Sequence, residues 1–305
     1  MHPILKIANV ISSIILNKLN VLITGADGQL GSCIKDRVKN YPLYKFNFHN
    51  SKTLDITDKK LVETFVTKND INYIINCAAY TAVDKAESEV DIAYKVNETG
   101  VLNLAEAANR NNAKMIHFST DYVFAGDSDK PYLPDSTIDP QGVYGASKAA
   151  GEKALLNSKC ESIIIRTSWV YSEYGNNFYK TMHRLGAEKE SLNVVNDQIG
   201  CPTYAGDLAL LSLSIVDSGK LTNNEIYHYC NAGKLSWYDF AKEIMKIAEH
   251  NCKINPIPTN EYPTPALRPP FSLMNTEKIA KEYGISIPWW KDSLLKCHNN
   301  FQKLK

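Results

Sequence analysis

A tyrosine and a lysine four residues apart are the side chains of this sequence best suited to acid–base chemistry. Tyr144 and Lys148 lie at the start of a helix predicted over residues 147–157. A spacing of i, i+4 puts both side chains on one helical face. A nearby ammonium favours tyrosinate and lowers the tyrosine pKa, so the phenol can protonate a carbonyl oxygen as a hydride arrives. We therefore expect Tyr144 to be a general acid that Lys148 tunes.

A hydroxyl that could complete this site lies upstream, in the segment Ser119-Thr120-Asp121-Tyr122-Val123-Phe124. This segment ends a strand predicted over residues 114–119. In doubly wound sheets the carboxyl ends of the strands face the ligand crevice. Thr120 could there hydrogen-bond a substrate oxygen. The three side chains predict hydride transfer to a ketone carbon, with Thr120 positioning the oxygen.

A glycine-rich turn supplies a place for the hydride donor. Gly25, Gly28 and Gly31 form a G-x-x-G-x-x-G pattern between a predicted strand (21–24) and a predicted helix (30–38). The first glycine makes a tight turn, the second lets the backbone approach a pyrophosphate, and the third allows close packing of helix on strand. The helix N-terminus adds N–H donors for phosphate. The pattern predicts a dinucleotide site that also includes Gln29 and Leu30.

The elements that must position these residues alternate regularly from residue 20 onward. Apolar strands followed by helices indicate βαβ units with right-handed crossovers. We therefore predict an α/β fold, a Rossmann-type doubly wound parallel sheet with a smaller C-terminal substrate-binding lobe. The predicted strands cover residues 21–24, 43–48, 73–77, 114–119 and 162–167, and the predicted helices cover 30–38, 59–68, 90–109 and 147–157.

The regularity weakens beyond about residue 170, and a proline-rich stretch covers residues 255–270. Loops of this kind often build ligand sites on a scaffold. Residues 1–19 stand apart, with isoleucines at roughly helical spacing, and are too short to span a bilayer. We expect an N-terminal extension of unclear role over 1–19, an NAD(P)-binding Rossmann domain over 20–170, and a mainly substrate-binding lobe over 171–305 with segments that return to the Rossmann domain.

Composition narrows the class of protein. The 305 residues contain 34 Lys and Arg against 33 Asp and Glu, a net charge of +1 that argues against a nucleic-acid binder. No run of 18 apolar residues predicts a membrane span. Seven cysteines, an odd number without a C-x-x-C pair, suit buried thiols in a reducing cytoplasm. The seven histidines show no ligand spacing, so we expect no metal site.

The choice between NAD and NADP depends on the loop after the second predicted strand. An acidic residue there would bind the ribose hydroxyls of NAD and repel the additional phosphate of NADP. This sequence has no acid at that place, and His49 or Lys52 could pair with a 2′-phosphate. We therefore expect NADPH as the cofactor, with NADH tolerated.

The glycine spacing resembles that of the short-chain dehydrogenase/reductase superfamily, and further segments in the right order resemble one family within it, the dTDP-4-dehydrorhamnose reductases. The resemblance covers about residues 20–296. It implies reduction of the C4 ketone of dTDP-4-dehydro-β-L-rhamnose to dTDP-β-L-rhamnose for surface polysaccharide. The segments that carry it cover residues 78–87, 119–126, 166–171, 175–178, 197–203 and 268–269.

The resemblance also implies roles for individual residues. Asp55 and Ile56 would flank the adenine, although Asp55 could equally cap the following helix. Trp169 would stack on the sugar, with core packing as its alternative, and a turn is as plausible as a substrate contact for Asn177. The remaining cofactor contacts would be Ala78, Ala79, Tyr80 and Thr81, and the remaining substrate contacts would be Val83, Thr120, Asp121 and Arg268.

The sequence is also consistent with functions other than this reduction. Related sugar dehydratases carry a Glu after the Thr-Asp pair, and Tyr122 in that place argues against water elimination because it cannot act as that acid at neutral pH. A nucleotide-sugar epimerase or another nucleotide-sugar reductase fits the same Tyr and Lys. A non-catalytic NADP-binding protein, resembling the regulatory subunit of methionine adenosyltransferase, is a hypothesis of a different class. The sequence fixes neither the nucleotide nor the oligomeric state, and a homodimer stays open.

Overall fold

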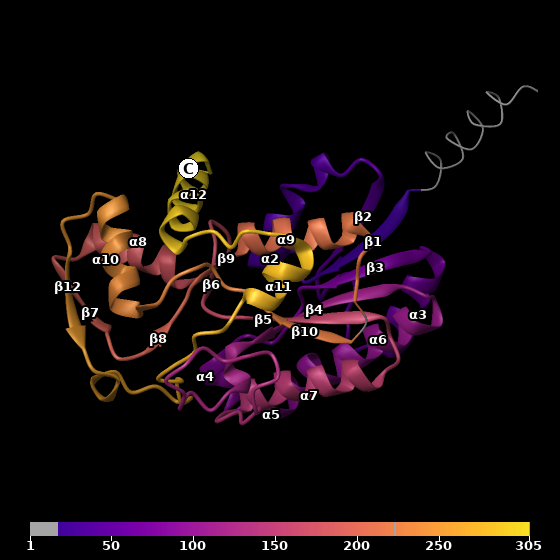
Figure 1. The fold of residues 1–305 in the computed structure, drawn as a ribbon, viewed down its shortest axis with the longest axis horizontal. Helices are drawn as coiled ribbons and strands as arrows, with labels where there is room; N and C mark the ends of the chain where they lie inside the picture. Colours follow the sequence, from indigo (N-terminus) through magenta and orange to yellow (C-terminus); the bar gives the residue numbers. More distant parts are fainter. Residues whose placement is uncertain (1–17, 223, 305) are drawn as a thin grey trace, which may run out of the picture.

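A parallel sheet of six strands, in the order β10-β5-β4-β3-β1-β2, forms the centre of the computed structural model, which describes residues 18–222 and 224–304 (Figure 1). All of its pairings are parallel. This confirms the predicted Rossmann-type sheet. The strands are β1 (Leu19–Thr24), β2 (Tyr44–His49), β3 (Ile71–Asn76), β4 (Lys114–Thr120), β5 (Ser162–Thr167) and β10 (Glu225–His228).

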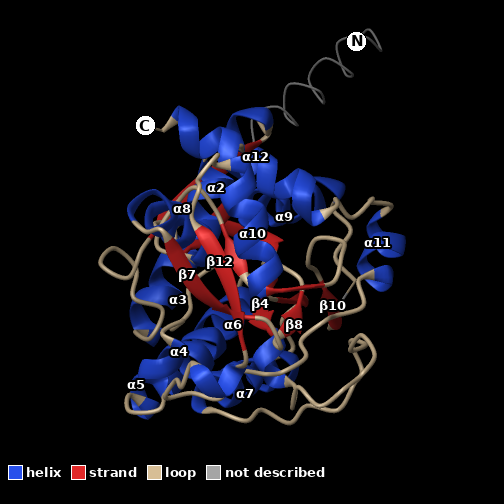
Figure 2. Cartoon of the chain, turned by 90° about the vertical axis from the view of Figure 1, so that its left-hand side faces the viewer, coloured by secondary structure: helices blue, strands red, loops and turns tan. Residues whose placement is uncertain are grey.

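Helices cover both faces of the sheet because alternate strand residues point to opposite sides. Val21 and Ile23 of β1 pack with α2 (Gln29–Lys35) and α9 (Ala205–Ser218). Leu22 packs on the other side in a cluster with α3, α6 and α7. Figures 1 and 2 show these two layers of helices. The second layer consists of α3 (Lys59–Lys68), α6 (Gly100–Arg110) and α7 (Val143–Asn157).

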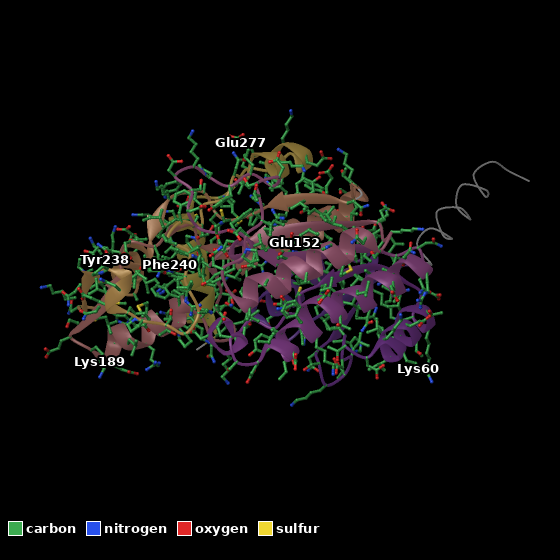
Figure 3. The ribbon with its side chains drawn as sticks, turned by 90° about the horizontal axis from the view of Figure 1, so that it is seen from below. Lys60, Glu152, Lys189, Tyr238, Phe240 and Glu277 are labelled. Carbon is green, nitrogen blue, oxygen red and sulfur yellow. The ribbon has the colours of Figure 1, made fainter. Side chains whose placement is uncertain are left out.

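The C-terminal part of the chain contributes to both regions of the molecule. It returns β10 and α9 to the sheet, and α11 (Glu277–Tyr283) also packs on the sheet core through Ile279. The rest forms a smaller lobe with its own apolar core around Phe240, which Figure 3 labels. Its elements are α8 (Phe178–Glu188), α10 (Trp237–Ile247), α12 (Trp290–Lys303), and the paired strands β7 (Ser191–Val195) and β12 (Lys253–Ile257).

The remaining elements of the described chain are short. Two small pairs of strands are β6 (Val170–Tyr171) with β9 (Thr203–Tyr204), and β8 (Ile199–Gly200) with β11 (Leu235–Ser236). The remaining short elements are the helices α4 (Val83–Ala86) and α5 (Val90–Tyr94), the π-helix η2 (Lys95–Thr99), and the 3₁₀ helices η1 (Val38–Asn40), η3 (Asp121–Val123) and η4 (Thr259–Glu261).

Three predicted helices differ from the observed ones. The helix expected over residues 30–38 ends at Lys35, and Val38 belongs to the separate 3₁₀ helix η1. The helix expected over residues 90–109 is divided into α5, η2 and α6. The helix expected over 147–157 begins four residues earlier, at Val143, because the Glu87 carboxylate accepts a hydrogen bond from the Val143 N–H (2.9 Å). Tyr144 therefore lies inside the first turn of α7.

All seven cysteines are free thiols, and six of them are buried. This agrees with their expected use as small apolar side chains. Within residues 18–222 and 224–304, no helix has the length and apolar character needed to cross a membrane. An N-terminal extension is expected over residues 1–19. Residues 1–17 lie outside the described residues, and Leu19 already belongs to β1.

Candidate active site

The turn after β1 packs directly against the turn after β3. Gly25 has a φ of +61°, and a Cβ at this position would lie 2.6 Å from the Ala78 nitrogen and the Cys77 carbonyl. Only glycine can occupy such a place without displacing the neighbouring backbone. The Gly28 N–H donates to the Gly25 carbonyl (3.0 Å) and Gly28 is the N-cap of α2. The tight turn expected between β1 and α2 is therefore present, and its binding of a pyrophosphate stays a prediction.

Asn97 in the π-helix η2 holds the segment after β3. Its Oδ1 accepts from the Tyr80 N–H (2.9 Å), and its Nδ2 donates to the Tyr80 carbonyl (3.1 Å) and to Ser147 Oγ (3.0 Å). It thus ties the segment that contains Ala79 and Thr81 to α7. The Tyr80 hydroxyl itself donates to Glu89. Single π-turns are frequent at functional sites, but the sequence pattern did not reveal this one.

α7 lies unusually close to the polar segment that follows β4. A Cβ on Gly145 would lie 2.1 Å from the Tyr122 carbonyl oxygen, so only glycine permits this approach. As a result the Tyr144 ring packs edge-on against the Tyr122 ring, with centroids 5.4 Å apart. The Thr120 hydroxyl lies within hydrogen-bonding reach of the Tyr144 hydroxyl. Thr120, Tyr144 and Lys148 are therefore gathered at the carboxyl end of the sheet.

The expected effect of Lys148 on Tyr144 is not what the structure shows. Burial raises the pKa of Tyr144 to about 12, and the Thr120 hydroxyl offsets this only in part. The prediction of a lowered pKa was therefore wrong. The reason is the direction of the lysine, whose Nζ donates to the Phe118 carbonyl (2.7 Å) and lies 3.4 Å from His117 Nε2. Burial lowers the pKa of Lys148 itself to about 8.

Buried polar atoms next to these residues lack partners. Asp121 Oδ1 accepts from the Thr120 hydroxyl (2.9 Å), whereas its Oδ2 has no hydrogen-bond partner among the described residues. The Ser119 hydroxyl is also buried without a partner there, whereas the Ser272 hydroxyl lies against the Asp121 carboxylate. Burial raises the pKa of Asp121 to about 6. Because buried polar groups are normally paired, this set of atoms fits a ligand that carries hydroxyl groups.

Trp169 lies between β5 and β6 and has a strained backbone conformation. Its φ of +48° falls in the left-handed region, which a bulky side chain rarely adopts and which often marks a functional site. Its indole stacks on Trp237 with ring centroids 3.7 Å apart, and Phe178 packs on Trp237 in turn (4.6 Å). Both indoles are half-buried, so Trp169 belongs to an aromatic platform rather than to the closed core.

Arg268 clamps the proline-rich segment onto α4. Its Nη2 donates to Asp84 Oδ2 (2.7 Å), and the Ala266 N–H donates to Asp84 Oδ1 (3.2 Å). Arg268 Nη1 is buried with no partner among the described residues. Burial raises the pKa of Tyr122, and the nearby Arg268 guanidinium offsets this only in part. Val83, the first residue of α4, is thus brought to the same side of the molecule as Arg268.

Asn177 has its polar atoms committed to the protein. Its Nδ2 donates to Gln29 Oε1 (2.9 Å) and to the Ser172 carbonyl (2.8 Å), and its Oδ1 caps α8 through the Lys180 N–H (3.0 Å). Gln29 Oε1 also accepts from the Ser172 hydroxyl (3.0 Å). Asn177 therefore couples the glycine-rich turn to the second lobe. A direct contact with substrate stays a prediction.

Comparison with known proteins assigns this arrangement to a family. The model of the RmlD substrate binding domain matches residues 19–303. The dTDP-4-dehydrorhamnose reductase of Aggregatibacter actinomycetemcomitans is 44% identical over 283 residues, which is 90% of this chain and 96% of that protein. The chain belongs to the dTDP-4-dehydrorhamnose reductase family.

Solved structures of dTDP-4-dehydrorhamnose reductases have the same fold. The protein from Clostridium acetobutylicum is 38% identical with a TM-score of 0.89, covering 93% of this chain and 100% of that one. The protein from Bacillus anthracis, solved in complex with NADP, is 39% identical with the same TM-score and the same coverage. The resemblance inferred from the sequence motifs is therefore confirmed.

The family resemblance placed Asp55 and Ile56 at the adenine, and the structure separates their roles. Asp55 does not cap α3. Its Oδ1 accepts from the Thr57 N–H and hydroxyl (both 2.9 Å), whereas Asp58 is the N-cap and accepts from the Leu61 N–H. Ile56 is buried, and its side chain lies where a Cβ on Gly100 would be. Asp55 remains exposed and available to a ligand.

The loop predicted to select the cofactor lies beside the glycine-rich turn. The His49 carbonyl accepts from the Ala26 N–H (3.0 Å), and Asn50 donates to Asp27. Lys52 is exposed, whereas His49 is half-buried and burial lowers its pKa. Of the two candidates for a 2′-phosphate, Lys52 is the exposed one.

Sequence reasoning missed several residues at this site. Asn76 and His117 are fully buried polar side chains within apolar strands. Their polarity at inward-facing positions is a signal that could have identified them, since buried polar groups need a specific partner. Trp237 and Asp84 gave no such signal because their partners are distant in sequence. In the described part of the chain, no three His, Cys, Asp or Glu residues lie together as metal ligands.

Proposed function

We propose that this protein reduces the C4 ketone of dTDP-4-dehydro-β-L-rhamnose to a hydroxyl, giving dTDP-β-L-rhamnose, with NADPH as the reductant and NADH tolerated. The carrying observation is the grouping of Thr120, Tyr144 and Lys148 at the carboxyl end of the sheet. A relative that shares 44% identity across 96% of its own length bears the name of this reductase. Tyr122, in place of a Glu, supports reduction rather than dehydration.

The residues of the chain fit the cofactor. The Gly25 turn leaves no room for a Cβ and brings backbone close to where a pyrophosphate would lie. Lys52 is exposed next to this turn, in a loop without an acidic residue at the end of β2. NADP in the related Bacillus anthracis structure supports the same choice. We propose that residues 20–170 hold the cofactor and residues 171–305 mainly hold the sugar nucleotide.

Proton delivery follows from the geometry. When bound, NADPH supplies the hydride to C4. The pKa of Tyr144, raised by burial to about 12, keeps its phenol protonated at neutral pH. Tyr144 thus holds the proton that the ketone oxygen gains as the carbon accepts the hydride. Thr120 Oγ1 now donates to Asp121 and can turn to donate to the same oxygen.

Recognition of the sugar would use the unpaired polar atoms around this centre. The Asp121 carboxylate and the Ser272 hydroxyl beside it could bind sugar hydroxyls, and Arg268 Nη1 could act as a donor. The face of Trp169 offers an apolar surface of the kind on which a sugar ring can stack. The dianionic diphosphate would need only such local donors, which is consistent with the net charge of +1.

The direct test is to follow NADPH absorbance with dTDP-4-dehydro-β-L-rhamnose as substrate. We expect one NADPH to be oxidised per sugar, slower turnover with NADH, and an L-rhamnosyl product by NMR. Interconversion of sugar epimers without net NADPH consumption would indicate an epimerase instead. Absence of NADPH oxidation, together with tight binding to a partner enzyme, would favour the non-catalytic alternative.

A further inference from the structure

A chain of buried polar side chains crosses the sheet beneath the active site and ends at Lys148. Thr24 of β1 donates through its hydroxyl to Asn76 Oδ1 on β3 (2.6 Å). Asn76 Nδ2 lies 3.0 Å from His117 Nδ1 on β4, and His117 Nε2 lies 3.4 Å from Lys148 Nζ. All four residues are at most 1% exposed. Such a chain in a sheet interior must have a definite arrangement of protons.

The backbone fixes the orientation of the Asn76 amide. The Ala78 N–H, which can only donate, lies 3.2 Å from Asn76 Oδ1. The opposite orientation would place the NH₂ group against this N–H. Asn76 therefore presents its NH₂ to His117, and His117 Nδ1 must accept.

A neutral imidazole has one acceptor nitrogen and one N–H. Since Nδ1 accepts from Asn76, the proton of His117 lies on Nε2, facing the lysine nitrogen. Burial holds the pKa of His117 well below its ordinary value, so the ring stays neutral. An Nε2–H group can donate to the lone pair of a neutral amine, but it repels an ammonium.

We propose that His117, held by Asn76 with its proton on Nε2, is a positioning residue that favours the neutral amine of Lys148. The amine then accepts from Nε2–H and donates to the Phe118 carbonyl (2.7 Å). The significance for catalysis rests on the proposed function, in which Lys148 stands one helical turn from the acid Tyr144. The proton arrangement itself does not depend on that function.

The other charged groups around Lys148 do not provide a matching anion. The buried titratable or charged side chains of the elements packed against α7 are His117 of β4, Asp121 of η3 and Arg166 of β5. On α7, Glu152 raises the Lys148 pKa, but both of its oxygens bind Arg166 (2.9 and 2.7 Å). Figure 3 labels Glu152. Burial prevails, and the Lys148 pKa falls to about 8.

Two NMR measurements on the protein without cofactor or substrate test this proposal. The imidazole ¹⁵N shifts of His117 report its tautomer, with His117→Phe to assign the signals. We expect a proton on Nε2 and none on Nδ1. A proton on Nδ1, or an imidazolium near neutral pH, would overturn the proposal. This result does not depend on whether an Asn76 variant folds.

The second measurement follows the ¹³Cε shift of Lys148 with pH, with Lys148→Met to assign it. Asn76→Asp is nearly isosteric and should draw the proton to Nδ1, leaving Nε2 to accept from an ammonium. We expect the Lys148 midpoint to rise by about 1–2 pH units. In the His117→Phe background the same change should have a much smaller effect. An equal rise in both backgrounds would show simple attraction by the carboxylate and would contradict the proposal.

These outcomes are distinguishable from a failure of the proposed function. If the protein did not reduce the sugar, the tautomer and the Lys148 midpoint would still be measured as described. If it reduced the sugar but the tautomer were reversed, the proposed function would stand and the role of His117 would fall. In the active enzyme, Asn76→Asp should also move the pH dependence of kcat upward, which a purely structural role would not do.

Discussion

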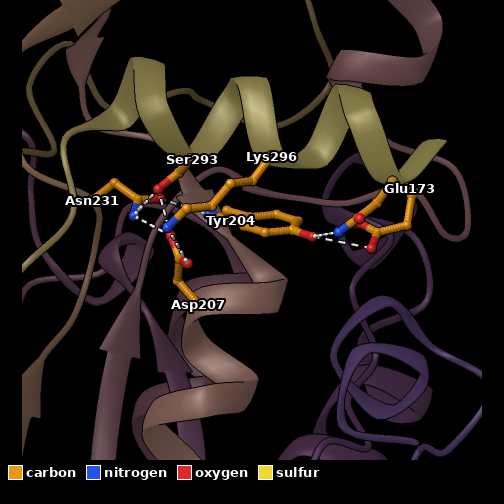
Figure 4. Close-up of polar contacts among 7 residues, drawn as sticks. Glu173, Tyr204, Asp207, Asn231, Ser293 and Lys296 are labelled. Atoms are coloured by element: carbon orange, nitrogen blue, oxygen red, sulfur yellow. Dashed lines mark hydrogen bonds and ion pairs between the residues drawn. The ribbon is translucent and has the colours of Figure 1, made fainter. Parts of the chain in front are cut away.

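The polar chain beneath the active site and the polar network between α9 and α12 both end in a lysine side chain. In the network, Asp207 Oδ2 accepts from Asn231 Nδ2 (2.9 Å) and from the Ser293 hydroxyl, and its Oδ1 lies 3.8 Å from Lys296 Nζ (Figure 4). The Lys296 side chain is 56% exposed. This lysine therefore pairs with a carboxylate and keeps most of its hydration.

The network has a second branch, formed by the hydrogen bonds of the Tyr204 hydroxyl. The Tyr204 hydroxyl donates to Glu173 Oε1 (3.0 Å) and accepts from Asn300 Nδ2 (2.9 Å) (Figure 4). These contacts join β9, the loop after β6 and α12, which lie far apart in sequence. The network connects the two regions of the molecule.

Unlike Lys296, Lys148 has neither a carboxylate partner in the described part of the chain nor appreciable contact with solvent. It is 1% exposed, and no carboxylate lies within ion-pair distance of it among the described residues. A buried ammonium without a close counter-ion costs stability. The difference indicates that the Asp207 network stabilises the fold, whereas the chain ending at Lys148 holds a charge that can change. Function and stability are thus supported by different polar groups.

The largest expected effect comes from Tyr144→Phe, which removes the proton donor but no buried charge. Turnover should fall by about 10²–10⁴-fold, while NADPH affinity and the unfolding free energy change little. Steady-state NADPH oxidation, cofactor titration by fluorescence and urea unfolding measure the three quantities. Full activity in this variant would remove Tyr144 from its assigned role.

Asp207→Ala should lower the unfolding free energy while turnover stays nearly unchanged. It removes one buried hydrogen bond from each of Asn231 and Ser293, which still bond each other (2.9 Å), so we expect a loss of about 2–3 kcal/mol in unfolding free energy. Turnover at saturating substrate should stay within about twofold of wild type. A loss of activity without a loss of stability would break the proposed division between the two networks.

Lys296→Met should have the smallest effect, because the pair it forms with Asp207 is long and its ammonium is exposed. We expect a change of about 0–1 kcal/mol in unfolding free energy. Urea unfolding at low and high salt provides the measurement and its control, since screening should abolish any difference. A loss as large as that of Asp207→Ala would mean that the ion pair, rather than the hydrogen bonds, carries the network.

The sequence predicted the parts of this site that depend on local spacing. Gly25 and Gly28 lie in the turn after β1 and Gly31 lies in the first turn of α2. Tyr144 and Lys148 share one helix, so the residue types and intervals indicate the chemistry. Residues 59–68 form the predicted helix without any change of bounds. Within a βαβ fold, Thr120 at the end of its strand also follows from the topology.

The sequence could not predict what depends on distant partners or on burial. The raised pKa of Tyr144 results from enclosure by other elements, and the clamp between Arg268 and Asp84 joins residues 184 positions apart. The stacking of Trp237 on Trp169 and the hydrogen bond from the Val143 N–H, at the start of α7, to the Glu87 carboxylate are also tertiary effects. The π-helix η2 follows from packing against α7, where Gly151 closely approaches the Asn97 carbonyl.

The most direct test of this account is the unfolding free energy of Lys148→Met against wild type between pH 7 and pH 10.5. The Lys148 pKa of about 8 lies below the ordinary value of 10.5, so between these values the unfolded chain binds more protons and wild type gains stability as pH rises. The variant should be inactive, yet more stable at pH 7 by on the order of 1–3 kcal/mol, with an advantage that shrinks toward pH 10.5. A variant less stable than wild type at pH 7 would contradict the claim that this lysine is held at a cost to the fold.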